Sequence, residues 1–78
     1  MSDELFERFR KTAADSLSKP VDEITAEASF ADDLDADSLD LVQMVMDLEE
    51  EFDITVDEEE LEGITTVNQA FELIKSKL

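Results

Sequence analysis

Residues 37–53 read DSLDLVQMVMDLEEEFD and carry the clearest helical pattern in the chain. Four apolar residues recur in this stretch at intervals of four, three and four: Leu41, Val45, Leu48 and Phe52. This spacing is typical of the core-facing stripe of an amphipathic helix. Asp37 stands directly before the pattern and Asp40 three residues later, which is the arrangement of an N-terminal capping box. The stretch therefore predicts a helix that begins at Ser38 and packs its stripe against a core.

Further helices are predicted on both sides of this stretch. Apolar residues recur at helical spacing over residues 2–18: Leu5, Phe6, Phe9, Ala13 and Leu17. Near the end of the chain they again share one face: Val67, Ala70, Phe71 and Ile74. Thr66 and Gln69 form the capping-box pair of that last helix. Asp57 and Glu60 form another such pair, where only about one and a half turns of a shorter helix fit.

Residues 20–36 lack a sustained period and predict a long connection between the first two helices. Its isolated apolar residues are expected to reach the core: Val21, Ile24, Phe30 and Leu34. Connections of this length tend to be functional or to contain a short helical turn. The sequence therefore predicts an all-α fold, a small four-helix bundle with three longer helices, one short helix and a long first connection, in a single domain over residues 1–78.

The charge of the chain is strongly negative and unevenly distributed. The chain contains 6 basic and 23 acidic residues, which gives a formal net charge of −17. All the basic residues lie before Pro20 or after Leu73, whereas the acidic ones, apart from four near the start, lie between. Such a surface repels nucleic-acid backbones and anionic membranes and favours basic protein surfaces. We therefore expect protein partners, no nucleic acid and no membrane.

Several classes of protein are disfavoured by what the composition lacks. The chain contains no Cys, so it has no thiolate ligand and no disulfide. It also contains no His, the residue that most often acts as a general base. No stretch approaches the ~20 apolar residues of a membrane span, and the first residues lack the apolar region of a signal peptide. A cytoplasmic protein is therefore expected.

Ser38 is the candidate functional residue, through its hydroxyl group. At the first helical position, a phosphate attached to its hydroxyl meets the unpaired N–H groups and the positive end of the helix dipole. A second apolar strip runs beside the core stripe: Leu39, Val42 and Met46. Acidic residues flank this strip: Asp40, Asp47, Glu49 and Glu50. The strip has the composition of a docking face, although Val42 is as compatible with the core.

The run FADDLDADSLDLVQMVMDLEEEFDI, residues 30–54, resembles the signature of acyl carrier proteins, and the similarity extends through VNQAFELI at residues 67–74. The resemblance implies that a transferase moves 4′-phosphopantetheine from coenzyme A to the hydroxyl of Ser38, between Asp37 and Leu39. The terminal thiol then holds acyl groups as thioesters. The protein is expected to act in fatty acid biosynthesis as a monomeric carrier and not as an enzyme.

The resemblance also implies a partner surface. In the family, the acidic second helix contacts basic patches on the transferase and on fatty-acid-synthesis enzymes. This maps the partner contacts onto Asp40, Val42, Met46, Asp47, Glu49 and Glu50, with Glu58, Glu59, Glu60 and Glu62 nearby.

Two positions depart from the family pattern. The family usually has Gly where this chain has Asp35, which points to a backbone conformation that most residues adopt less easily. Asp is among the better tolerated residues in left-handed geometry, so we expect a local adjustment there. Gln43 stands where an acidic residue is frequent, which removes one partner contact.

Rival interpretations rest on single features. Asp33, Asp35 and Asp37 match the first ligand positions of an EF-hand loop, but Ser38 stands where that loop needs Gly and Met44 where it needs Glu, so no dedicated metal site is predicted. Loose binding of divalent cations by clustered carboxylates stays open. An acidic mimic of nucleic acid leaves Ser38 unexplained, and a serine hydrolase lacks a base. Within the family, a polyketide or other specialised carrier shares the same signature.

Overall fold

The computed structural model describes residues 2–78, with side chains from Glu4 onward. It contains four α-helices, α1 (Ser2–Leu17), α2 (Ser38–Phe52), α3 (Glu58–Leu61) and α4 (Val67–Ser76), and a 3-10 turn, η1 (Val21–Glu23). Among the described residues there is no strand. The structure confirms the predicted all-α bundle, with one short helix and a long first connection that contains a helical turn.

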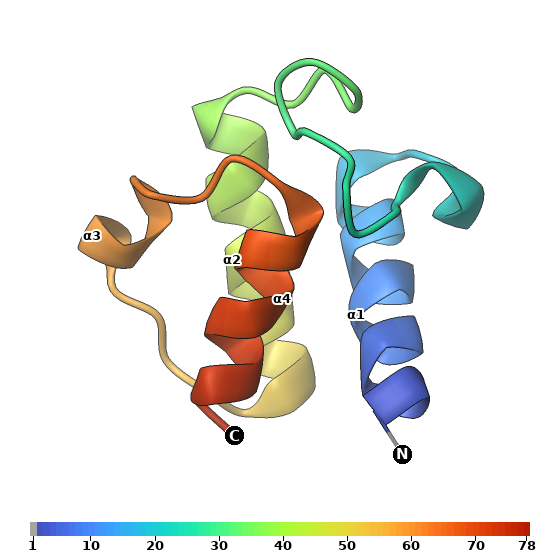
Figure 1. Cartoon of the computed structure of the whole chain (residues 1–78). Coiled ribbons are helices and arrows are strands. Elements are labelled where there is room, and N and C mark those ends of the chain that lie inside the picture. The colour runs from blue at the N-terminus through green and yellow to red at the C-terminus, as the bar shows by residue number, and fades with distance from the viewer. Residues whose placement is uncertain (1) are drawn as a thin grey trace.

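The helices pack with two different relative directions (Figure 1). α1 packs against α2 and runs antiparallel to it. After α2 the chain returns along the length of the bundle through α3, so that α4 starts beside the start of α2 and runs in the same direction. α3 lies on the side of the bundle away from α1. The return segment is therefore what places a short helix near the N-terminal end of α2.

One continuous cluster of buried apolar side chains holds the helices together. The largest fully buried members are Phe9, Ile24, Phe30, Leu34, Met44, Leu48, Ile74 and Val67. The stripe predicted for α4 is buried at all four positions, and that of α2 at three, with Leu41 half-buried. The ring centroids of Phe6 and Phe71 lie 4.9 Å apart in edge-to-face geometry, which joins α1 to α4.

The long connection is folded against the rest of the molecule. Its predicted apolar contacts are confirmed, since three of the four residues are buried and Val21 is half-buried. The Phe30 N–H donates to the Thr65 carbonyl oxygen at 3.0 Å, and the Val67 N–H donates to the Ala28 carbonyl oxygen at 2.9 Å. These bonds attach the connection to the start of α4. The segment that leads into α2 is therefore held in place by backbone hydrogen bonds.

Capping pairs begin the two C-terminal helices, as predicted. At α4, the Gln69 N–H donates to Thr66 Oγ1 at 3.3 Å and the Thr66 N–H donates to Gln69 Oε1 at 3.1 Å. At α3, the Asp57 N–H donates to Glu60 Oε2 at 3.0 Å. These side chains satisfy donors that a helix start leaves without partners.

Asp35 has a φ of 52°, in the left-handed region, which confirms the expectation drawn from its position. A Cβ atom is strained there, and Asp is among the residues that tolerate this region better than most. We predict that Asp35→Gly is more stable than Asp35→Ala by ~1 kcal/mol, since Gly carries no Cβ and both variants remove the same charge. Urea unfolding of the two variants measures the difference. Equal stabilities would contradict a strained backbone at this residue.

Candidate functional site

Ser38 is the first residue of α2 and its side chain is exposed. The residues on either side of it form the predicted capping box. The Asp40 N–H donates to Asp37 Oδ1 at 3.0 Å, and the Asp37 N–H donates to Asp40 Oδ2 at 3.2 Å. This reciprocal pair fixes the backbone around Ser38 at the dipole-positive end of a 15-residue helix. The hydroxyl is thus accessible and held in a defined place.

Two shallow hollows adjoin Ser38, and Leu41 lines both of them. The larger, of about 430 Å³, lies toward the long connection and includes Phe30, Ala36 and Ile64 in its lining. The smaller, of about 200 Å³, lies between α2 and α3. It is lined by Ser38, Leu41, Val42, Glu58, Leu61 and Glu62. A flexible apolar group attached to Ser38 therefore has apolar surface on two sides.

The second apolar strip of α2 faces outward. Leu39 is 78% exposed, Val42 37% and Met46 52%. The exposure of Val42 decides between the two interpretations left open above, because a core residue would be buried. Large exposed apolar side chains in a row are typical of a docking surface. The strip is confirmed as exposed, and its binding role stays a prediction.

The predicted acidic contacts differ in how free their carboxylates are. Asp40, Glu50, Glu58, Glu59 and Glu62 are exposed. Asp47 is half-buried and accepts a hydrogen bond from Gln43 Nε2 at 3.2 Å. Glu49 and Glu60 have partners inside the molecule. The negative surface therefore consists mainly of carboxylates that keep their charge available to a partner.

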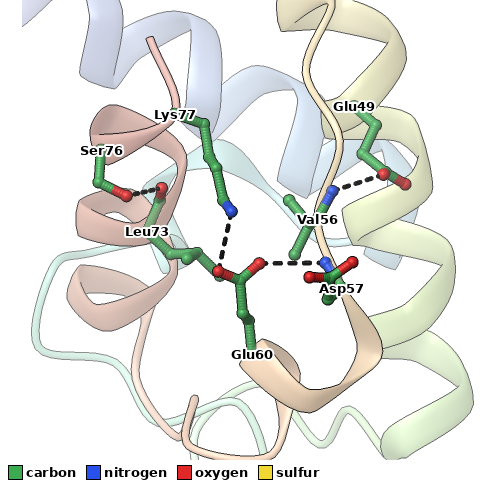
Figure 2. A network of polar contacts seen from close by, with 7 residues as sticks. All are labelled: Glu49, Val56, Asp57, Glu60, Leu73, Ser76 and Lys77. Atoms are coloured by element: carbon green, nitrogen blue, oxygen red, sulfur yellow. Dashed lines mark hydrogen bonds and ion pairs between the residues drawn. The ribbon is translucent and has the colours of Figure 1, made fainter.

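A polar network attaches α3 to its neighbours (Figure 2). Glu49 Oε2 accepts a hydrogen bond from the Val56 N–H at 2.8 Å. Glu60 Oε1 pairs with Lys77 Nζ at 2.8 Å. The Lys77 ammonium and then the Asp57 N–H hold the pKa of the Glu60 carboxyl below its usual value. The stabilisation from Glu60 is thus present at neutral pH and is lost as the pH falls through that lowered pKa.

This pairing of Lys77 is a feature that the sequence reasoning missed. From the sequence, Lys75 and Lys77 are suited only to the C-terminal end of the last helix, where the helix dipole favours positive charge. The distance of 17 residues between Glu60 and Lys77 follows no helical spacing, so no local signal predicts the pair.

The remaining site classes find little support in the described part of the chain. No group of three or more acidic residues there is placed to hold a metal ion. Lys75 lies near the C-terminal end of α4 and Lys77 directly after it, while Ser38 begins α2 at the opposite end of the bundle (Figure 1). No helix between residues 2 and 78 is long and apolar enough to cross a membrane.

Comparison with known proteins shows close relatives. The family model described as a phosphopantetheine attachment site matches residues 7–74. The chain is 53% identical over 76 residues to an acyl carrier protein of Petrotoga mobilis. These residues make up 97% of this chain and 89% of that protein. It is 51% identical over 69 residues to an acyl carrier protein of an Exiguobacterium species, covering 88% and 87% of the two chains.

The helical bundle and the family match define a carrier domain with a covalently attached 4′-phosphopantetheine group. The chain belongs to the acyl carrier protein family. Its role is to carry acyl groups, and fatty acid synthesis is the usual context of that role.

Proposed function

We propose that Ser38 is the residue that carries the 4′-phosphopantetheine group in this chain. The observation that supports it is an exposed hydroxyl at the first position of α2, fixed by a capping box and adjoined by two hollows. When attached, the group supplies a thiol that forms thioesters with acyl groups. The chain itself contributes the attachment oxygen and the apolar surface beside it.

The electrostatics at Ser38 are compatible with a phosphodiester. A phosphodiester adds about one negative charge, less than a phosphomonoester. The unpaired N–H groups of the first turn of α2 and its dipole favour that charge. They offset part of the repulsion from Asp37 and Asp40, whose carboxylates already accept hydrogen bonds from backbone N–H groups. The residues present therefore fit the group.

Loading of the unmodified wild-type chain tests this proposal. Incubation with coenzyme A and a phosphopantetheinyl transferase is followed by intact-mass measurement. We expect the mass to rise by one phosphopantetheine group. An unchanged mass would contradict the proposed attachment.

We also propose that the chain catalyses nothing itself and docks on the transferase and on basic surfaces of synthesis enzymes. The docking surface consists of the exposed strip and the acidic residues around it: Leu39, Val42, Met46, Asp40, Asp47, Glu50, Glu58, Glu59 and Glu62. Glu49 and Glu60 also belong to this surface, although intramolecular partners already bind their carboxylates. Charge complementarity mainly raises the encounter rate, which suits a carrier that must leave each enzyme quickly.

Leu39→Ala tests the docking surface. Leu39 is highly exposed and directly follows Ser38, so its truncation removes an apolar contact at the centre of the surface. We predict that kcat/KM for loading falls about tenfold, which corresponds to ~1.4 kcal/mol, while Tm is unchanged. The matched control is Leu78→Ala, because Leu78 is also exposed, at 58%, and lies after α4. Loading of Leu39→Ala at the rate of this control would contradict the docking role.

The chain is proposed to act as a monomer, as one acyl-carrier domain and in the cytoplasm. The family match over residues 7–74 supports the single domain. The net charge of −17 disfavours self-association through this surface, because like charges would face each other.

A further inference from the structure

α3 is the element that depends most on contacts made by other elements. It has only four residues, and none of them is buried. An isolated helix of one turn is unstable, because its nucleation costs more than one hydrogen bond returns. Its position is therefore set by the side chains that hold it. Leu61 packs against the core but is only half-buried. Polar contacts therefore supply a large share of the interactions that hold α3 in place.

Two of those polar contacts come from different helices (Figure 2). Glu49 of α2 binds the backbone just before α3, at Val56. Lys77, directly after α4, binds Glu60 within α3. The other oxygen of Glu60 accepts the Asp57 N–H, so the same carboxylate caps the helix and anchors it. The ion pair thus connects the C-terminal end of α4 to α3, a helix that makes few apolar contacts itself.

The same helix forms one wall of the smaller hollow beside Ser38. Glu58, Leu61 and Glu62 face Ser38, Leu41 and Val42 across a volume of about 200 Å³. Any displacement of α3 therefore changes the width of this hollow. The ion pair acts at Glu60, between Glu58 and Leu61 in sequence, and so restrains both of these lining residues.

We propose that Lys77 is a positioning residue for the cargo: its ion pair with Glu60 holds α3 as the wall of the hollow beside Ser38. The proposal rests on the attachment at Ser38 proposed above. An acyl chain that extends from the arm into this hollow is covered by α3 while the pair is formed. When the pair opens, α3 moves away from α2 and the chain is exposed to solvent.

The expected effect is local and moderate. Ion pairs at the surface contribute little to global stability, and the Lys77 and Glu60 side chains are 28% and 32% exposed. Loss of such a pair shifts a local opening equilibrium by about two- to fivefold. α3 responds because it lacks buried residues, whereas the buried faces of α2 and α4 do not depend on the pair.

The first experiment measures amide hydrogen exchange in Lys77→Ala and Lys75→Ala. Both variants remove one positive charge from the end of α4, but Lys75 makes no ion pair in the described part of the chain. We expect amides 58–64 to exchange about two- to fivefold faster in Lys77→Ala only. Lys77→Arg should restore the wild-type rate, and Glu60→Gln should behave like Lys77→Ala. Equal exchange in the two alanine variants would overturn the proposal.

The second experiment uses chains loaded with octanoyl or acetyl thioesters and cleaves them with hydroxylamine. An octanoyl chain is long enough to enter the hollow, while an acetyl group is not. We expect Lys77→Ala to speed octanoyl cleavage about two- to fivefold and to leave acetyl cleavage unchanged. Unchanged octanoyl cleavage, or equal acceleration of both thioesters, would overturn the role in covering cargo. If wild type did not load at all, the attachment at Ser38 would fail, and the exchange rates would still decide whether Lys77 holds α3.

Discussion

Ser38→Ala should abolish phosphopantetheine loading while the helical fold persists. The variant removes the only atom that the proposed ester bond requires, so the expected loss is complete. Ser38 is exposed at the start of α2, and the capping box is formed by the residues around it. Its truncation is therefore expected to change the free energy of unfolding by no more than ~0.5 kcal/mol. Intact mass after incubation with coenzyme A and a transferase, together with a thermal melt, measures both effects.

The matched control for this variant is Ser29→Ala. Ser29 lines the same hollow as Ser38, from the side of the long connection, and is the serine that an incorrect assignment would confuse with it. We expect the Ser29→Ala chain to gain mass like wild type. A mass gain on Ser38→Ala, or its loss on Ser29→Ala, would move the attachment to another residue.

Leu48→Ala should destabilise the fold more than any change on the outer face of α2. Leu48 is fully buried in the middle of the core stripe of α2, the helix that packs against α1. Replacing a buried Leu by Ala costs ~2 to 5 kcal/mol, through lost apolar burial and the cavity left behind. A domain of this size has a total stability of only ~4 to 12 kcal/mol. The Tm should therefore fall by at least ~8 °C.

Met46→Ala provides the comparison on the same helix. Met46 lies two residues before Leu48 but is 52% exposed, because the two residues are on different faces of α2. Its truncation should change the free energy of unfolding by less than ~0.5 kcal/mol. Circular dichroism melts of both variants in one buffer measure the contrast. Similar Tm values for the two would contradict the assignment of the core face.

Local patterns predicted the helices and their starting points well. The box pairs at Asp37 and Thr66 were predicted because their partners stand three residues later, and the structure shows both. The stripe of α4 was predicted from spacing alone and is buried throughout. These features follow from the periodicity of a helix, which is visible in the spacing of apolar residues along the sequence.

Features that depend on the packing of distant segments were not predicted. Met44 is fully buried beside the predicted stripe of α2, because α2 is covered on more than one side and its core face is wider than one row. The hydrogen bonds between residues 28–30 and 65–67 join segments without any shared pattern. The same holds for the site: spacing predicted the exposure of Leu39 and Met46 but left Val42 open, and the ion pair on α3 could not be predicted without the fold.

The first and last described residues lie at one pole of the bundle, while α2 begins at the other (Figure 1). A tag, a fluorophore or a surface linker attached at either terminus would therefore be held a bundle length away from the pantetheine arm. A chain immobilised in this way presents the end of the bundle that carries Ser38 to an incoming enzyme without steric interference.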